Sequence, residues 1–449
     1  MVFTDIEMKT SVVILAAGEG TRMSSNFPKA MQVLAGKPML YHIKQATEGL
    51  SIEQTVVVCS PDAERHMAKT LGSENQNIIY VQQKEPLGTG HALSCSLSKL
   101  NQENVVLVLL GDVPLIKPKT LKKLVASAAK DTLTVLTAKI SKPKGYGRIV
   151  RNTNNEIVAI LEDEECTQKQ KTITEINSGI MAFPPNRISQ WLGRLGANNK
   201  KGEYYLTDTI GFAVEDGSPV DSIHPQSIEE IFGVNDKKQL AEAEKIKRKE
   251  VTDKLLKTGT TLADPQRIDI RGDLVCGKDV FIDVNVVFEG SVRISEGAII
   301  GPHSVIANTT IGKNTKILSH CNLENANIGD NCNVGPFARL RPGTELMDSS
   351  KAGNFVEIKK SQIGKGSKVN HLSYVGDAVV GNDANIGAGT ITCNYDGVSK
   401  HKTIIEDNVF IGSGVELVAP VAIKEGATIG AGSTITKEAP SNKLTLERA

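Results

Sequence analysis

Residues 15 to 29 run Leu-Ala-Ala-Gly-Glu-Gly-Thr-Arg-Met-Ser-Ser-Asn-Phe-Pro-Lys, and this stretch decides the fold of the first half of the chain. The apolar run 12–15 that leads into it is typical of a buried strand. Gly18 and Gly20 allow a sharp turn in which the backbone approaches a ligand closely, and exposed amides in such a turn bind anions. Arg22 and Lys29 place two cations beside the turn. We therefore predict a strand that runs into a phosphate-binding loop.

The full pattern of this loop is more specific than a Gly-x-Gly turn. It is Leu-x-x-Gly-x-Gly-Thr-x-Met followed by Pro-Lys, and it resembles the signature of sugar-1-phosphate nucleotidyltransferases, which join a sugar phosphate to a nucleoside triphosphate. It is neither a Walker A loop nor a dinucleotide-binding loop, because Gly-Lys-Ser/Thr and Gly-x-Gly-x-x-Gly are both missing from it. The alternative is an ordinary turn between a strand and a helix, with charges at the surface.

Length and composition narrow the class of protein. The chain has 449 residues, which favours two or three domains, and a net charge of +1 from 52 basic and 51 acidic residues, without the basic bias of a nucleic-acid-binding protein. No apolar run approaches the ~20 residues of a membrane span, and the first residues, with Asp5 and Glu7, show no signal-peptide pattern. Seven scattered cysteines without a Cys-x-x-Cys pair indicate reduced thiols in the cytoplasm.

The first half alternates between strand and helix patterns. Apolar, strand-like runs lie at 12–15, 55–59, 78–82, 105–110, 132–138, 149–151, 157–162 and 176–183. Helical patterns lie at 39–50, 63–71, 90–100, 118–129 and 186–195. This alternation predicts an α/β, Rossmann-like domain with a mostly parallel sheet wrapped by helices. Ligands of such sheets bind beyond the carboxyl ends of the strands, so the functional residues should follow strands directly.

Polar residues do follow several of these runs. Gln83 comes after the third run, and its amide, which both donates and accepts, can recognise the edge of a base. Gly88 and Thr89 open the next helix and can approach the base or ribose; Thr89 is equally suited to be a simple N-cap. Gly111 and Asp112 end the most apolar run. Asp112 is a candidate ligand of Mg²⁺, which takes few protein oxygens and the rest from phosphate and water; a solvated loop charge is the alternative.

Further polar loops come later in the same half. They are 145–148 (Gly-Tyr-Gly-Arg), Glu162, 177–179 (Asn-Ser-Gly), 202–208 (Gly-Glu-Tyr-Tyr-Leu-Thr-Asp) and 233–235 (Gly-Val-Asn). Donors and acceptors in loops after strands suit a hydroxyl-rich sugar. Each segment taken singly is equally well a turn or a cap, but in this order behind the phosphate loop the set indicates a sugar-nucleotide site.

At this point the resemblance extends to one family, the bacterial bifunctional N-acetylglucosamine-1-phosphate uridyltransferases and glucosamine-1-phosphate N-acetyltransferases. It implies the roles of the residues in the first half. Nucleotide contacts are Leu15, Ala16, Ala17, Gly18, Arg22 and Lys29, with Gln83, Gly88, Thr89 and Gly111; sugar contacts are Gly147, Glu162 and Asn177; magnesium ligands are Asp112 and Asn235. One departure is Leu110, where the family has tyrosine, so a hydroxyl contact is lost there.

The middle of the chain predicts a connecting helix. Residues 237–257 are rich in Lys, Glu, Ala and Leu, which are strong helix formers. Leu240, Ala243, Ile246 and Val251 form only a thin apolar stripe, so we expect a polar, solvent-bridging helix with i, i+4 ion pairs. The expected domains are therefore residues 1–236, a linker helix at 237–257, and residues 258–449.

The last part of the chain is a repeat. Isoleucine or leucine recurs every six residues at 405, 411, 417, 423, 429 and 435, and shorter stretches keep the same period from residue 311 onward. A helix would need a period of 3.6, whereas a six-residue period is typical of a parallel β-helix whose coils stack. Resemblance to hexapeptide-repeat proteins implies that this β-helix is left-handed and that the protein is a homotrimer.

The six-residue period is lost at about 340–360 and again at 394–402, and insertions into such repeats often carry function. His371 lies in this region, and histidine is suited to exchange a proton near neutral pH; a hydrogen-bonded structural histidine is the alternative. Arg341, Lys359 and Lys360 can bind a phosphate.

The family resemblance covers this half too. It implies that His371 is the general base, that the sugar phosphate binds Arg341, Lys359, Tyr374 and Asn385, and that acetyl-CoA binds Ala388, Asn394, Tyr395, Ser413, Ala431 and Arg448. The tail, residues 438–449, lacks the six-residue period, and we expect it to reach a neighbouring subunit.

The resemblance implies a bifunctional cytoplasmic enzyme with small-molecule partners and neither nucleic-acid nor membrane partners. Its substrates would be glucosamine 1-phosphate, acetyl-CoA and UTP, its metal Mg²⁺, and its product UDP-N-acetylglucosamine, which feeds peptidoglycan and lipopolysaccharide synthesis. Two alternatives remain: a different sugar-1-phosphate nucleotidyltransferase, making ADP-glucose or GDP-mannose, whose repeat is structural, and a non-catalytic regulator that kept the fold.

Overall fold

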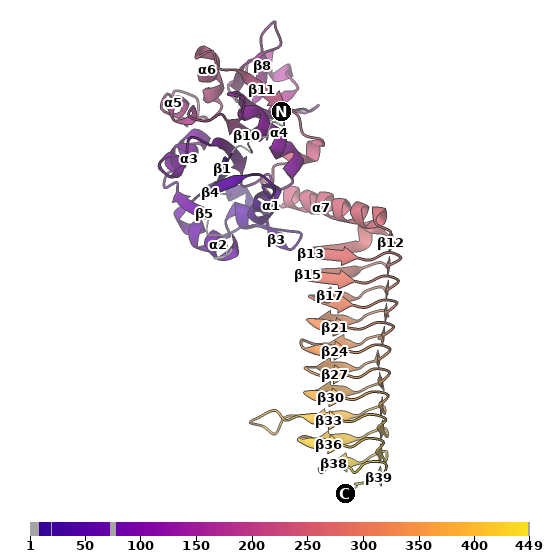
Figure 1. Ribbon diagram of the computed structural model, residues 1–449. Helices are drawn as coiled ribbons and strands as arrows, with labels where there is room; N and C mark the ends of the chain where they lie inside the picture. Colours follow the sequence, from indigo (N-terminus) through magenta and orange to yellow (C-terminus); the bar gives the residue numbers. More distant parts are fainter. Residues whose placement is uncertain (1–8, 19, 72–77, 448–449) are drawn as a thin grey trace, which may run out of the picture. The chain divides into compact units, whose positions relative to one another are not determined.

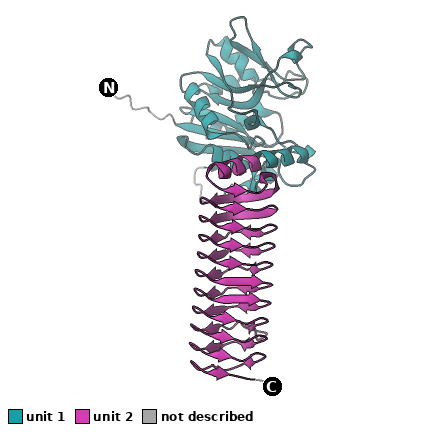
Figure 2. Ribbon diagram, turned by 90° about the vertical axis from the view of Figure 1, so that its right-hand side faces the viewer, with its two compact units in different colours: residues 1–246 teal, residues 247–449 magenta. Residues whose placement is uncertain are grey.

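The computed structural model describes residues 9–18, 20–71 and 78–447 of the chain. The chain divides into two compact units, residues 1–246 and residues 247–449, which are coloured separately in Figure 2. Among the described residues, no helix is long and apolar enough to cross a membrane.

The first unit is built on one twisted sheet (Figure 1). Its main path runs β11-β7-β10-β6-β1-β4-β5, with β8 and β9 added beside β10. The strands are β1 Thr10–Ala16, β4 Ile52–Cys59, β5 Ile78–Gln82, β6 Val105–Leu110, β7 Leu133–Lys139, β8 Arg148–Arg151, β9 Ile157–Leu161, β10 Glu175–Phe183 and β11 Val220–Ile223; β2 Val33–Leu34 and β3 Lys37–Pro38 form a separate hairpin. β1 pairs in parallel with β4 and β6, whereas β10 is antiparallel to β6, β7 and β8.

Helices cover both faces of this sheet. They are α1 Met39–Ala46, α2 Pro61–Leu71, α3 Thr89–Ser96, α4 Pro118–Ala128, α5 Ile188–Leu192 and α6 Asp208–Glu215; short 3-10 helices are η1 Thr21–Met23, η2 Lys29–Met31, η3 Leu97–Lys99, η4 Gln170–Thr172 and η5 Ile228–Ile231. Alternate residues of β1 point to opposite faces. Val12 and Ile14 join a core with α1, α2 and α4, and Val13 and Leu15 join a core with α3, α5 and α6. This two-sided burial explains the continuous apolar run of β1.

The predicted α/β alternation is confirmed, with differences at the ends of helices. α1, α3 and α5 are shorter than their sequence patterns; α1 ends at Ala46, and Gly49 follows it with a φ of 85°. Two elements, α6 and β11, were not predicted, because α6 begins inside the segment 202–208 that was interpreted as a loop.

Helix α7, Lys237–Lys257, is divided between the two units. In the first unit, Ala243 is buried and Leu240 and Ile246 pack around a small core that includes Met23 and Val234. In the second unit, Leu255 is buried in the core of the repeat. The expectation of a merely solvent-bridging helix is therefore wrong, because the thin apolar stripe packs against both units.

The second unit is a parallel β-helix with three faces, after the 3-10 helix η6 Pro265–Arg267 (Figure 1). The first face contains β12 Thr261–Leu262, β14 Phe281–Ile282, β16 Ile299–Ile300, β19 Lys316–Ile317, β22 Asn333–Val334, β25 Lys351–Asn354, β28 Lys368–His371, β31 Asn385–Ile386, β34 Phe410–Ile411, β37 Thr428–Ile429 and β39 Leu444–Thr445. The long strands β13 Ile268–Cys276 and β15 Val286–Ile294 span the other two faces.

After β15 these two faces continue with short strands. The second face contains β17 Val305–Ala307, β20 Asn322–Glu324, β23 Arg339–Leu340, β26 Glu357–Lys359, β29 Tyr374–Gly376, β32 Ile391–Cys393, β35 Glu416–Val418 and β38 Thr434–Ile435. The third face contains β18 Thr310–Ile311, β21 Ala326–Ile328, β24 Thr344–Leu346, β27 Gln362–Ile363, β30 Ala378–Val380, β33 Thr403–Ile405 and β36 Val421–Ile423. Each strand pairs with the strand one coil later, so the backbone hydrogen bonds run between coils.

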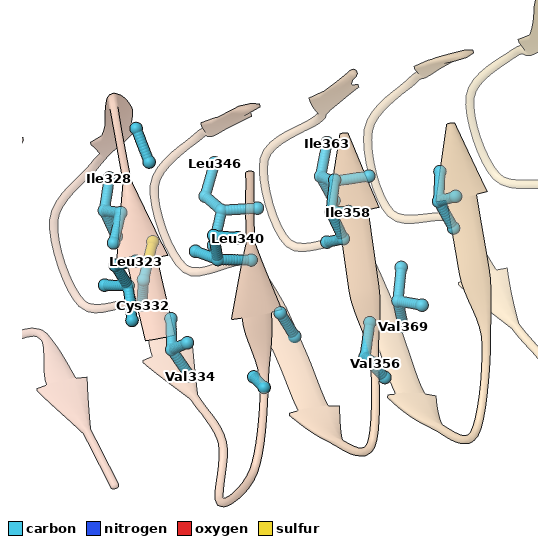
Figure 3. Packing of buried hydrophobic residues seen from close by; sticks show 14 of the residues in the cluster. Leu323, Ile328, Cys332, Val334, Leu340, Leu346, Val356, Ile358, Ile363 and Val369 are labelled. Carbon is cyan, nitrogen blue, oxygen red and sulfur yellow. The ribbon is translucent and has the colours of Figure 1, made fainter. Parts of the chain in front are cut away.

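The core of the β-helix is a stack of the predicted six-residue positions. Figure 3 shows Leu340, Ile358 and Val369 among the side chains that point into the prism. Ile300 pairs with Ile317, 17 residues later, and Val334 pairs with Ala352, 18 residues later. The expected interruption at 340–360 is therefore wrong: the coil there is one residue longer and remains paired.

The second expected interruption is confirmed. Ile386 pairs with Ile411, 25 residues later, so one coil carries an insertion. The insertion contains a bridge between Tyr395 and Lys400 and projects from the coil just before β33 (Figure 1).

The tail behaves differently from the expectation. Leu444 and Thr445 form β39, which pairs with β37, and the hydroxyl of Thr436 donates to a carboxylate oxygen of Glu447 over 2.9 Å. The described part of the tail therefore completes the last coil of its own prism, and no part of it up to Glu447 extends away to a neighbouring subunit. This closure covers the end of the core, as terminal repeats of solenoids must.

The stacked core makes a direct prediction about stability. Replacing Ile358, which is fully buried, by alanine is expected to lower the free energy of unfolding by about 3 kcal/mol, because the prism cannot collapse around the cavity. Ile404→Ala is the matched control: Ile404 lies in β33 but is 42% exposed, and we expect a loss below about 1 kcal/mol. Urea unfolding followed by circular dichroism measures both; equal losses would contradict the inward orientation of residue 358.

Candidate active sites

The predicted phosphate loop follows β1 at the carboxyl edge of the sheet. Gly20 has a φ of 63°, and a Cβ atom added to it would lie 2.8 Å from the Cβ of Lys29, so glycine lets the loop fold against Lys29. Gly111 follows β6, and its amide donates to the carbonyl of Leu15 over 2.8 Å. A Cβ on Gly111 would lie 2.9 Å from that of Ala16. The two glycines therefore let the ends of β1 and β6 approach Lys29.

Four predicted residues meet in one charged cluster at this edge. The ammonium of Lys29 donates to Oδ2 of Asp112 and, over 2.8 Å, to Oδ1 of Asn235. Arg22 also donates to Oδ1 of Asn235, over 2.9 Å. The amide of Val234 donates to the carbonyl of Asp112 over 2.8 Å, which fixes the loop of Asn235 beside the end of β6. Residues more than two hundred positions apart in the chain thus form one site.

The donor set of this cluster fits a divalent cation. Asp112 and Asn235 each direct an oxygen at the same ammonium group, so both oxygens face a common point where positive charge is stable. One carboxylate and one amide oxygen are ligands that Mg²⁺ accepts, with phosphate oxygens and water completing its shell. Arg22 and Lys29 add the cations that phosphate oxygens require.

Two adjoining cavities open beside the cluster. The first, of about 310 Å³, is lined by Leu15, Ala16, Ala17, Gly18, Lys29, Ala30, Gln83, Pro86, Gly88, Thr89, Ala92, Leu110, Gly111, Asp112 and Glu203. The second, of about 400 Å³, includes Arg22, Gly147, Glu162, Asn177, Thr207 and Asn235. Thr89, Leu110 and Asp112 line both, so the charged cluster lies where the cavities meet. Every residue predicted for the nucleotide and sugar site lines one of them.

The first cavity contains the candidate base-binding residues. Gln83 is buried and donates through Nε2 to the carbonyl of Gly88 over 3.1 Å. The N-cap of α3 is Gly88, with a φ of 102°, so the simple N-cap expected at Thr89 is wrong. The hydroxyl of Thr89 instead accepts a hydrogen bond from the amide of Leu206 over 3.2 Å, which ties the start of α3 to the loop before α6.

The second cavity is lined by fixed donors and acceptors. The amide of Asn177 donates to the carbonyl of Gly147 over 2.9 Å, and its side-chain oxygen accepts from the amide of Gly179. The hydroxyl of Thr207 donates to Glu162 over 3.0 Å, a contact that the sequence patterns did not single out. Leu110 lies against Gly179, where an added Cβ would be 2.5 Å from its Cδ1, so an apolar side chain fills the position of the family tyrosine.

Burial in this cavity raises the pKa of Glu162. A carboxyl group whose folded pKa exceeds its unfolded pKa costs stability as pH rises through these two values, and costs nothing well below them. Glu162→Gln is therefore expected to raise Tm by about 2 °C at pH 7.5 and to leave it unchanged at pH 4. Thermal unfolding at both pH values tests this, with the exposed Glu103→Gln as control; a stabilisation that does not depend on pH would contradict the assigned cause.

In the second unit, His371 is exposed at the end of β28. Its Nδ1 lies 2.7 Å from Oδ1 of Asn354, one coil earlier. Because an amide oxygen only accepts, the proton of the neutral imidazole is held on Nδ1, and the lone pair of Nε2 is left to receive a proton. The sequence patterns did not single out Asn354.

Cations gather on the second face beside His371. Arg341 follows β23, and its amide donates to the carbonyl of Ile358, which places it across from Lys359 in the next coil. Arg341 also pairs with Glu357 over 2.8 Å. Lys359 lies against Lys400 of the insertion and lowers the pKa of Lys400, because the two ammonium groups repel each other. Adjacent like charges of this kind favour a bound anion; Lys400 was missed because its place in the insertion shows no periodicity.

The corner of the prism changes character at His371. The αL positions of this corner carry the side chains of His303, His320, Phe337, Phe355 and Leu372, and then the glycines Gly389, Gly414 and Gly432. A Cβ atom on Gly414 or Gly432 would meet no heavy atom within 4 Å. The residues before these glycines, Ala388, Ser413 and Ala431, therefore line an open shelf that leads away from His371.

The remaining predicted contacts are less closely grouped. Asn394 donates to Asp377 over 2.5 Å, and Tyr395 in the insertion is exposed. Tyr374 begins β29, where its register partner is Glu357. Asn385 is in register with Lys368 at the start of the first face, whereas His371 is at its end, so one chain does not bring Asn385 to His371. Arg448 lies outside the described residues.

All seven cysteines are free thiols, as predicted. Burial raises the pKa of Cys276 and Cys321 to about 11, so these two remain protonated and are poor nucleophiles. Neither candidate site depends on a thiolate.

Comparisons with known proteins agree with both sites. Residues 12–174 match the family model of the MobA-like NTP transferase domain, and residues 402–437 match that of the bacterial transferase hexapeptide, which identifies the prism as a left-handed parallel β-helix. The chain is 49% identical to a protein of Nitrosospira multiformis named bifunctional protein GlmU, over 98% of this chain and 95% of that protein. It is 48% identical to proteins of the same name from Cupriavidus pinatubonensis and Nitrosomonas europaea, over 98% of this chain and 96% of each.

Proposed function

The chain belongs to the family of bifunctional GlmU proteins, and we propose that its two sites catalyse the two last steps of UDP-N-acetylglucosamine synthesis. The second unit transfers an acetyl group from acetyl-CoA to glucosamine 1-phosphate, and the first unit transfers a uridylyl group from UTP to the resulting N-acetylglucosamine 1-phosphate. The observation that carries the proposal is that one chain holds a charged cluster for phosphates at the end of β1 and β6 and, separately, an oriented histidine beside a group of cations.

In the acetyl transfer, Nε2 of His371 accepts a proton from the ammonium group of glucosamine 1-phosphate. The free amine then attacks the thioester carbonyl carbon of acetyl-CoA; the new C–N bond forms, the C–S bond breaks, and coenzyme A leaves. Asn354 holds the imidazole in the tautomer that this step requires. Arg341, Lys359 and Lys400 hold the phosphate, and Tyr374 and Asn385 position the sugar. Ala388, Asn394, Tyr395, Ser413, Ala431 and Arg448 contact acetyl-CoA.

In the uridylyl transfer, a phosphate oxygen of N-acetylglucosamine 1-phosphate attacks the α-phosphorus of UTP. The bond to the β-phosphate breaks, and pyrophosphate leaves. Lys29 and Arg22 offset the negative charge that develops at the phosphorus. Asp112 and Asn235 would hold Mg²⁺, which neutralises phosphate charge and orients the triphosphate. Gln83, Gly88 and Thr89 hold the uridine, and Gly147, Glu162 and Asn177 hold the sugar.

The proposal extends to the assembly and boundaries. We propose a homotrimer formed through the β-helix, with small molecules as the other partners, and domains of residues 1–236 and 258–449 joined by the helix 237–257. Stacked hexapeptide coils expose long, regular faces, which supports association of copies. Leu110 replaces the hydroxyl contact of the family tyrosine with an apolar wall, so the proposed nucleotide site keeps its metal ligands but has one hydrogen bond fewer.

Assays of the separate half-reactions test the proposal. With glucosamine 1-phosphate and acetyl-CoA, we expect N-acetylglucosamine 1-phosphate; with N-acetylglucosamine 1-phosphate, UTP and Mg²⁺, we expect UDP-N-acetylglucosamine and pyrophosphate. The alternative of a different nucleotidyltransferase predicts that ATP or GTP replaces UTP and that acetyl transfer is absent. A non-catalytic regulator would bind nucleotide without turnover.

A further inference from the structure

The side chain of Gln83 has an environment that fixes which way its amide faces. Its Nε2 lies 3.1 Å from the carbonyl oxygen of Gly88 and 3.0 Å from Nδ1 of His91. A carbonyl oxygen only accepts hydrogen bonds, so the amino group and not the oxygen of Gln83 must face Gly88. The two hydrogens of that amino group then have two acceptors, Gly88 and His91.

His91 is held in the tautomer that accepts this bond. Nε2 of Gln83 has no lone pair to offer, so Nδ1 of His91 must be the acceptor and its proton is on Nε2. That Nε2 lies 3.8 Å from the sulfur of Cys95, one turn later in α3. The histidine therefore takes the second amide hydrogen of Gln83 without competing for its oxygen.

The position of His91 is itself fixed by the backbone around it. The amide of Gly90 donates to the carbonyl of Tyr204 over 2.8 Å, and the amide of Ala92 donates to the carbonyl of Gly88 over 3.1 Å. Added Cβ atoms on Gly88 and Gly90 would lie 2.7 and 2.8 Å from the carbonyl oxygen of Tyr204, so this turn of α3 packs tightly against residue 204. Such packing gives the imidazole little freedom to leave Gln83.

We propose that His91 is a positioning residue that sets the base specificity of the nucleotide site. With both amide hydrogens taken, Gln83 offers the first cavity only its Oε1, which accepts no hydrogen bond from any described residue. An acceptor at this place pairs with the N3–H of uracil. It meets a lone pair at N3 of cytosine, and a buried acceptor facing an acceptor is strongly disfavoured. This inference rests on the proposed placement of the base beside Gln83.

Binding of UTP and CTP to the full chain tests the inference, because it needs no turnover. We compare the ratio of the two Kd values in the unmodified protein, His91→Ala and His91→Asn. Alanine removes the acceptor, so the amide of Gln83 can rotate and offer a hydrogen to cytosine; the preference for UTP should fall about tenfold. Asparagine can place its side-chain oxygen where Nδ1 lies, so we expect this variant to keep the preference within about twofold.

A double-mutant cycle separates positioning from a general structural effect. In a Gln83→Ala background, His91→Ala should not change the UTP to CTP ratio further, because His91 acts through Gln83. A folded His91→Ala protein with an unchanged Tm and an unchanged ratio would overturn the inference, as would an equal effect in the Gln83→Ala background. A protein that prefers UTP but forms no UDP-sugar would instead refute the proposed function and leave this inference standing.

Discussion

His371→Ala is expected to lower kcat for acetyl transfer by about three orders of magnitude, within the range that general-base catalysis contributes. The neutral imidazole, oriented by Asn354, is the group that removes the ammonium proton, and without it the amine stays protonated and cannot attack the thioester. Uridylyl transfer from N-acetylglucosamine 1-phosphate should be unchanged, because its residues belong to the first unit. Single-turnover assays of both reactions measure the effect.

Two further variants sharpen this test. His303→Asn changes another exposed histidine of the same corner and keeps a residue type that tolerates its φ of 61°; we expect full acetyl transfer. Asn354→Ala should lower kcat about tenfold, since the histidine remains but its tautomer and direction are no longer fixed. A His371→Ala protein that keeps a tenth or more of the acetyltransferase activity would rule out the general-base role.

Asp112→Asn is expected to reduce uridylyl transfer by a factor of about a thousand, because electrostatic stabilisation by charged groups is the main contribution to phosphoryl-transfer catalysis. The substitution keeps the shape of the side chain but removes the only carboxylate that pairs with Lys29 among the described residues. Acetyl transfer should be unchanged. Rates at increasing Mg²⁺ concentration give the size of the loss and show a higher metal requirement.

The matched control for this variant is Asp131→Asn, which breaks an exposed pair with Arg187 on the same unit and should cost no activity. If Asp112→Asn retained normal uridylyl transfer at low Mg²⁺, the convergence of Asp112 and Asn235 would have to serve stability alone. In that case the variant would lower Tm without changing the rate.

Much of the architecture follows from local periodicity. The apolar runs of β1 and β6 predict buried parallel strands, and the spacing of residues such as Ile411 and Ile429 predicts a prism. Periodicity fails where the coil absorbs change: one additional residue between Val334 and Ala352 shifts the pattern but not the pairing. It also cannot show that β39 closes the last coil, because this strand is paired by position and not by composition.

The candidate sites depend on contacts that no local pattern contains. Asn235 joins Arg22 and Lys29 only because the chain returns to the end of β6 after Val234. The family resemblance named these residues, but not Thr207, Lys400 or Asn354. Asn354 could have been found, because it precedes His371 by 17 residues, the length of one coil. Lys400 and Thr207 reach their partners through irregular segments, where sequence spacing carries no geometric information.

The measurement that tests the account most directly uses the purified protein with glucosamine 1-phosphate, UTP, Mg²⁺ and acetyl-CoA carrying a ¹³C-labelled acetyl group, with products followed by mass spectrometry. The account predicts UDP-N-acetylglucosamine that contains the label and is absent when acetyl-CoA is omitted. Labelled N-acetylglucosamine 1-phosphate without any UDP-sugar would contradict the role of the first unit and point to Leu110. Failure to form either product would contradict the bifunctional assignment.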